Sequence, residues 1–178
     1  MSVEFVLSDI DDKELLDDNV YDVFEPTLKL QIHGRDVFDA LGIDGIRKVV
    51  VMHFMESALK VTQRMIADLA THPTGEYKYW FLGTGYGLLV KKRGEILEVS
   101  IETNPGMGPV VQGNLTHETH VLGEVSVQDW VRSIIVLCKQ LIDRITVANP
   151  KFKQFLTGLE RERTPLENWI SVLDSSKH

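Results

Sequence analysis

The residues with the greatest potential for chemistry are His117, His120 and Glu124. Imidazole and carboxylate groups are common zinc ligands, so these three residues define one candidate site, that of a metal-assisted hydrolase. Their spacing argues against it, because residues three apart point to opposite faces of a strand, and the glycines and β-branched residues around them predict strand or loop. The metal site is therefore kept as the alternative hypothesis, and no cofactor is predicted.

Two further motifs are better explained by folding than by catalysis. Gly83, Gly85 and Gly87 lie between two predicted strands, whereas a phosphate-binding loop lies between a strand and a helix, so they predict a hairpin turn. Cys138 falls on the apolar stripe of a predicted helix and is expected to be a small buried residue rather than a nucleophile. With no serine in a nucleophile elbow either, no catalytic residue is predicted.

The dense aromatic stretch needs the same choice between a ligand surface and a core. Tyr77, Tyr79, Trp80, Phe81 and Tyr86 precede a short basic turn, and an RNA-binding sheet can use such residues. The isoelectric point of about 5.3 favours a core role and predicts no nucleic-acid partner.

Negative charge is concentrated at one end of the chain. The 178 residues carry a net charge of −7, and residues 1–25 alone hold nine acids against one base. Such a field repels nucleic acid and anionic membranes but accelerates encounters with a basic protein. The alternative is a solvated stretch that only keeps the protein soluble. The candidate partner-binding residues are Asp9, Asp11, Asp12, Glu14, Asp17, Asp18 and Asp22.

Periodicity indicates the elements that would position these side chains. Alternating apolar residues predict strands at 3–7, 28–32, 77–82, 86–91 and 97–101, and a further strand within 115–125. Apolar residues three or four apart predict a long helix over 46–69 and a more buried one over 126–147. Asn149-Pro150 and Thr164-Pro165 predict the starts of two more helices.

Strands and helices segregate along the chain, which is typical of the α+β class. We expect an antiparallel sheet of about five strands packed against the long helix and a C-terminal helical segment. The length fits one domain, 1–178, with an acidic N-terminal segment (1–25), an α+β core (26–147) and C-terminal helices (150–174). No apolar run approaches the roughly 20 residues that cross a bilayer, and the N-terminus has no leader pattern, which predicts a cytoplasmic protein without membrane contact.

Residues 26–147 resemble, as a pattern, bacterial immunity proteins that accompany contact-dependent and other polymorphic toxins. The likeness lies in the strand and turn of 30–37, the helices over 46–69 and 126–147, and the glycine-rich stretch 80–90. The resemblance implies a non-enzymatic cytoplasmic protein that binds and neutralises one cognate toxin.

The leading hypothesis is therefore an inhibitor that presents an acidic surface to a basic toxin, with a nuclease domain as one fitting partner. The alternatives are the metal-assisted hydrolase and a non-catalytic structural or adaptor subunit. A homodimer is compatible with either binding hypothesis.

Overall fold

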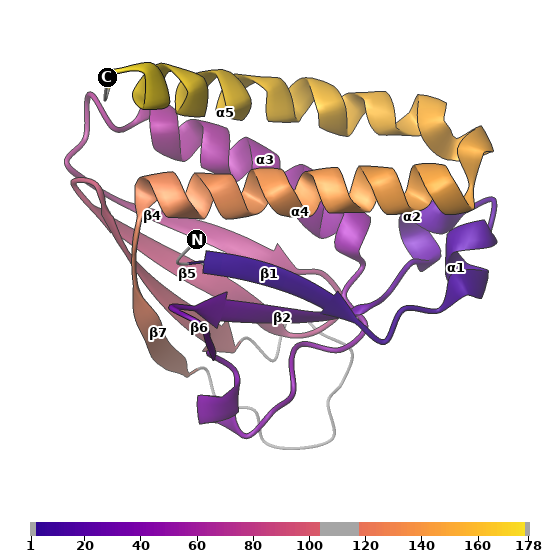
Figure 1. The fold of residues 1–178 in the computed structure, drawn as a ribbon. Coiled ribbons are helices and arrows are strands. Elements are labelled where there is room, and N and C mark those ends of the chain that lie inside the picture. The colour runs from indigo at the N-terminus through magenta and orange to yellow at the C-terminus, as the bar shows by residue number, and fades with distance from the viewer. Residues whose placement is uncertain (1–2, 104–117, 177–178) are drawn as a thin grey trace.

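The computed structural model describes residues 3–103 and 118–176, which form two antiparallel sheets covered on one side by helices (Figure 1). Helices α3 (Val51–Ala67) and α4 (Val127–Ala148) pack against the strands, and α5 (Thr157–Ser175) contacts both of these helices. The short helices α1 (Asp12–Leu16) and α2 (Val20–Val23) lie at one end of the molecule (Figure 1). The predicted α+β class is confirmed.

The strands divide into two sheets, so the prediction of one sheet of about five strands is wrong. The first sheet has the order β1 (Val3–Ser8), β2 (Thr27–Ile32), β3 (Arg35–Asp36). The second has the order β4 (Thr74–Phe81), β5 (Tyr86–Arg93), β6 (Ile96–Thr103), β7 (Thr119–Ser126). The two strands predicted at 3–7 and 28–32 are present and pair antiparallel with each other.

The reason for the division lies in the edge of β2 that faces away from β1. Leu28 exchanges two backbone hydrogen bonds of 2.8 Å with Ile46, and the carbonyl of Leu30 accepts from the amide of Val37 at 3.0 Å. These backbone groups are therefore unavailable to β7, the neighbouring strand of the second sheet. The two sheets instead meet where the Ile32 side chain lies against Gly123.

The hairpin turn predicted at the glycine-rich stretch is confirmed. Gly83 and Gly85 join β4 to β5 with φ values of 84° and 75°, and Gly94 joins β5 to β6 with φ of 61°; side chains rarely adopt this left-handed region. Gly87 has a different role, because a Cβ atom there would lie 2.4 Å from the Trp80 ring that covers it. The glycine-rich stretch thus forms a turn and a packing contact rather than a phosphate loop.

Helix α3 begins at Val51, five residues after the predicted start at Ile46. Ile46 has an apolar side chain at helical spacing, but its backbone bonds to Leu28 instead. Lys48 then takes a φ of 54°, which is incompatible with a right-handed helix. Long-range backbone pairing therefore overrides the local pattern at this end. Helix α4 begins where it was predicted, and the Ser126 hydroxyl caps it by accepting from the Asp129 amide at 3.0 Å.

The C-terminal helices also differ from the prediction. Residues after Asn149 form the 3-10 helix η2 (Pro150–Leu156), and α5 then runs without a break through Thr164 and Pro165, where a new helix start was predicted. A proline inside a helix removes one backbone hydrogen bond. Burial of one face of α5 against α3 and α4 offsets this loss; its buried residues are Leu159, Leu166 and Ile170.

Trp130 of α4 joins the two sheets at the centre of the core. Its side chain is fully buried and packs edge-on against Phe5 of β1 and Tyr79 of β4, with ring centroids 5.6 and 5.3 Å away. The indole Nε1 donates to the Tyr79 hydroxyl at 3.1 Å, and Thr62 of α3 lies within 3.2 Å of the same oxygen. One buried hydroxyl therefore connects both long helices to the second sheet.

Replacing Tyr79 by phenylalanine is expected to lower the free energy of unfolding by about 1–3 kcal/mol. The ring still fills its site, but the Trp130 indole loses the acceptor for its buried N–H group. Urea unfolding followed by circular dichroism measures the change. Tyr86→Phe is the matched control, because this side chain is half-buried and outside the network; an equal loss in both variants would contradict the role of the buried hydroxyl.

Candidate partner-binding site

The acidic segment folds into two short helices held by a few apolar anchors. The Asp11 carboxylate accepts from the amide of Lys13 at 2.8 Å and caps α1, and the Asp17 carboxylate accepts from the amide of Asn19 at 2.7 Å before α2. Leu15 and Val20 are buried, so they hold the helices against the core. Between residues 9 and 22, the side chains that are exposed to solvent are mostly acidic.

The predicted partner-binding residues are almost all accessible. Glu14 is half-buried, because its carboxylate accepts from the Glu25 amide at 3.0 Å. The others are solvent-exposed and belong to α1, α2 and the adjoining turns at one end of the molecule (Figure 1): Asp9, Asp11, Asp12, Asp17, Asp18 and Asp22. Since α1 and α2 contact each other, most of these carboxylates lie in one region, which we call the acidic end.

An open cleft lies on one side of this segment, with a volume of about 1070 Å³. Asp9 and Lys48 line it, and both have positive φ, an arrangement that is uncommon outside glycine. The lining includes more acids than bases: Asp9, Glu14, Glu25 and Asp44 against Arg47 and Lys48. One of these acids, Asp44, is already paired with Lys29. The excess negative charge of the segment thus extends into the cleft.

A second cleft, of about 680 Å³, lies on the other side, between β1 and α4; we call it the β1–α4 groove. One wall is β1 and the other is the C-terminal part of α4, and α1 contributes Asp12 and Leu15. The wall residues are Glu4, Phe5, Val6 and Leu7 on β1 and Gln140, Asp143, Arg144, Val147 and Ala148 on α4. Asp12 connects this groove to the acidic end.

Two exposed apolar residues near the acidic end were not predicted as site residues. Leu16 of α1 is 62% exposed, and Val147 of α4 is 82% exposed. The exposure of both residues could have been inferred from their positions in the sequence. A five-residue helix packed on one side cannot bury both Leu15 and Leu16, and Val147 lies two residues after the buried Ile145, about 200° around the helix. Single exposed apolar residues are common on protein surfaces, and these two lie beside the acidic end.

A cluster of polar side chains fixes α2 on α3. The Tyr21 hydroxyl donates to the Glu56 carboxylate at 2.5 Å, Lys60 binds the same carboxylate at 3.0 Å, and His53 Nε2 lies 2.7 Å from the Asp22 carboxylate. The hydrogen bond from Tyr21 and then that from Lys60 lower the pKa of Glu56 from its ordinary value. Asp22, at the edge of the acidic end, is thereby held in place.

Tyr21→Phe is expected to raise the pKa of Glu56 toward its ordinary value of 4.5. A carboxylate with a lowered folded-state pKa stabilises the protein above its unfolded-state pKa, and this contribution is lost as the pH falls through the folded-state value. The stability difference between the wild type and the variant should therefore be largest near neutrality and shrink below about pH 4.5. NMR titration of Glu56 measures the shift; an unchanged titration would contradict the hydrogen bond as its cause.

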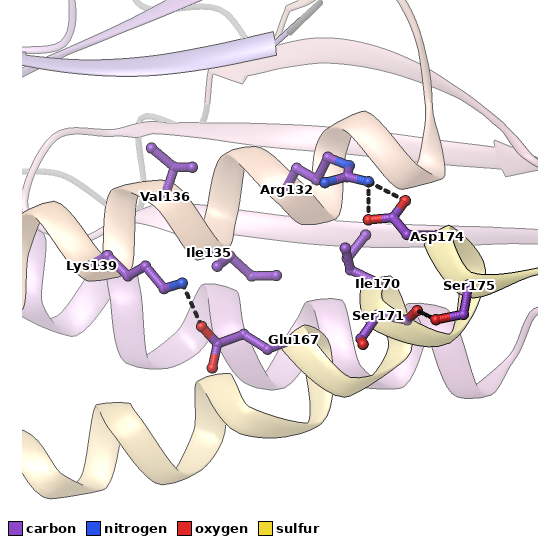
Figure 2. Close-up of a pocket in the computed structure, with 9 residues that line it drawn as sticks. All are labelled: Arg132, Ile135, Val136, Lys139, Glu167, Ile170, Ser171, Asp174 and Ser175. Carbon is purple, nitrogen blue, oxygen red and sulfur yellow. Dashed lines mark hydrogen bonds and ion pairs between the residues drawn. The ribbon is translucent and has the colours of Figure 1, made fainter. Parts of the chain in front are cut away.

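The groove between α4 and α5 has a different character (Figure 2). Arg132 binds both oxygens of the Asp174 carboxylate at 2.5 and 2.8 Å, and Lys139 binds Glu167 at 2.7 Å. These two bases on α4 are thus neutralised by acids on α5, above the buried Ile135. These exposed pairs stabilise by about 0–1 kcal/mol each. The groove of about 560 Å³ therefore has a balanced charge, unlike the acidic end.

The metal hypothesis gains no support from the part of the chain that the structure describes. His117 lies outside the described residues. His120 and Glu124 are exposed on β7; His120 lies 3.2 Å from Glu118, and the Glu124 carbonyl lies 3.0 Å from His33 Nε2. Within residues 3–103 and 118–176, no three His, Cys, Asp or Glu side chains are grouped as metal ligands.

Most of the remaining predicted residues belong to the core. Cys138 is fully buried, and burial raises the pKa of its thiol to about 11, so it is protonated at neutral pH. Tyr77, Tyr79 and Phe81 are buried beneath the helices, as the core interpretation of the aromatic stretch predicts, whereas Trp80 and Tyr86 are only partly buried. None of the described helices has the length and apolar character to cross a membrane.

Comparisons with protein-family models, with curated proteins and with solved structures give no match to this chain.

Proposed function

We propose that the chain is an inhibitory binding protein of the immunity type, whose acidic end docks onto a basic surface of a cognate toxin in the cytoplasm. The observation that supports this proposal is the accessibility of six of the seven predicted acidic residues at one end of the fold. Leu15 and Val20 occupy the inward positions of α1 and α2, so Asp12 and Asp22 on the same helices face solvent, and the other four acids are exposed in the adjoining turns.

Electrostatics give such a surface two properties that an inhibitor needs. Complementary charge increases the rate of association, and opposed like charges exclude wrong partners. The same field repels nucleic acid, so the surface suits the basic substrate cleft of a nuclease domain, which it would occupy in place of phosphate. Leu16 and Val147 supply exposed apolar area beside the charges, and affinity depends on burying such area.

Co-expression with the product of the adjacent upstream gene tests the proposal. A purification tag at the C-terminus leaves the acidic end free, and we expect a stable complex by size-exclusion chromatography together with loss of the toxic activity of the partner. Recovery of the two proteins as separate species, with the toxicity of the partner unchanged, would contradict the proposal for this gene pair.

A further inference from the structure

We infer that the β1–α4 groove binds an extended segment of the partner, in which lysine or arginine alternates with apolar residues, as an added strand along β1. The inference deepens the proposed function and rests on it for the basic character of the partner. It is carried by the unpaired edge of β1 and by the charge and shape of the groove beside that edge.

The free edge of β1 can be defined by residue. Within the described chain β1 pairs with β2 alone, so one of its edges has no strand partner. Leu28 and Leu30 of β2 direct their backbone groups away from β1, toward Ile46 and Val37. Because backbone groups alternate in direction along a strand, Lys29 and Gln31 face β1. In the register of the two strands, Lys29 lies opposite Val6 and Gln31 lies opposite Glu4.

It follows that the intervening residues of β1, Phe5 and Leu7, direct their N–H and C=O groups to the free edge. Both residues also line the β1–α4 groove. An incoming strand can therefore exchange hydrogen bonds with two residues whose backbone is not used by β2. The four groove-lining residues of β1 span about 13 Å, enough to pair with a short extended segment.

The groove has an apolar base beside this edge. Phe5 and Leu15 line it with side chains that are otherwise buried, and on the opposite wall Val147 is 82% exposed. Alternate side chains of an added strand would point in opposite directions, so one set can contact this apolar surface while the other faces the rim. The segment should therefore alternate apolar and polar residues.

The charged side chains at the rim of the groove determine which charge the polar residues of the bound segment should carry. Three carboxylates, those of Glu4, Asp12 and Asp143, line the groove against one guanidinium, that of Arg144. A segment carrying lysine or arginine complements this excess of negative charge. A second copy of this chain is a poorer occupant, since pairing two β1 edges would bring two sets of these carboxylates together.

A synthetic peptide of seven residues, with alternating lysine and valine and blocked ends, is the probe. Titrated into the isotope-labelled full chain, it should perturb the amide signals of Phe5 and Leu7 most strongly. The peptide with glutamate in place of lysine should bind at least tenfold more weakly. Perturbation confined to other parts of the molecule, or equal binding of the two peptides, would overturn the inference.

A matched pair of variants at Leu7 separates the contribution of the backbone edge to peptide binding from that of the side chain. Leu7→Pro removes an N–H group on the free edge without removing a hydrogen bond to β2, a position at which proline is tolerated in edge strands. It should weaken peptide binding at least tenfold, whereas Leu7→Ala, which keeps the N–H group, should change it by no more than about threefold. Equal binding by Leu7→Pro and wild type would overturn strand addition.

A second pair keeps the test decisive if Leu7→Pro does not fold. Val147→Lys places a positive charge on the groove wall, and Val172→Lys places one on α5 at a valine that is 68% exposed. Only the former should weaken peptide binding, again about tenfold or more; equal effects would contradict binding in this groove.

The failure of this inference is distinguishable from the failure of the proposed function. If Leu7→Pro and Val147→Lys leave complex formation with the toxin unchanged, the groove is not part of the interface, and the role of the acidic end still stands. If the chain binds the peptide at the β1 edge but binds no toxin, the groove is a binding site and the proposed inhibitory function is wrong.

Discussion

Trp130→Ala is expected to lower the free energy of unfolding by about 3–5 kcal/mol, the range typical of large cavities made in a core. The indole is completely buried, and it packs between the rings of Phe5 and Tyr79. Its loss also leaves the Tyr79 hydroxyl without a donor. Because typical domains are stable by about 5–15 kcal/mol, this change removes a large part of the total.

Urea unfolding monitored by far-ultraviolet circular dichroism measures this effect without depending on tryptophan fluorescence. Trp169→Ala is the control, since Trp169 of α5 is only partly buried and packs at the edge of the core. We expect a clearly smaller loss in the control and similar denaturant slopes in both variants. Equal losses would contradict the central position of Trp130 between the two sheets.

Neutralising the acidic end is expected to slow association with the toxin by about tenfold or more at low salt. The variant changes five residues to asparagine: Asp9, Asp11, Asp12, Asp17 and Asp18. Asparagine keeps the capping acceptors at positions 11 and 17 and tolerates the positive φ of Asp9, so the local fold is preserved. The net charge changes from −7 to −2.

A control with the same net charge separates a local surface from total charge. It changes five acids away from α1 and α2 to their amides: Asp39, Glu76, Glu95, Glu98 and Glu124. Stopped-flow association at several salt concentrations should show a large loss for the acidic-end variant and a small one for the control. The difference should narrow as salt screens the charges. Equal losses at low salt would contradict a role for the acidic end.

Most helices and strands could be predicted from the sequence because their apolar residues repeat at regular spacing. The helix over 126–147 buries one face, and the alternate apolar residues Leu88, Val90, Leu97 and Val99 of the strands over 86–91 and 97–101 are all buried, so burial explains the apolar spacing. The failures occur where distant backbone groups compete. Ile46 has helical spacing but pairs with Leu28, and this pairing both delays α3 and contributes to dividing the sheet.

Pro165 shows the opposite kind of competition. Thr164 and Pro165 have the local chemistry of a helix start, yet burial of one face along the whole of α5 outweighs the lost hydrogen bond. Local capping signals alone cannot show that a neighbouring layer of helices is present.

For the candidate site, the sequence indicated the charge but not the surface around it. A count of acids identifies residues 1–25, and Leu15 and Val20 determine which side faces solvent. The β1–α4 groove joins residues that are far apart in the sequence, such as Asp12 and Val147. No local pattern contains that juxtaposition, because it depends on how α4 packs against β1.

Hydrogen–deuterium exchange of the toxin complex against the free chain tests the central claim most directly. Docking through the acidic end predicts slower exchange in residues 9–23, and strand addition predicts it also at the amides of Phe5 and Leu7. The α4–α5 groove, which has balanced charge, should be unchanged. Protection confined to that groove or to the second sheet, with residues 3–23 exchanging as in the free chain, would contradict the account.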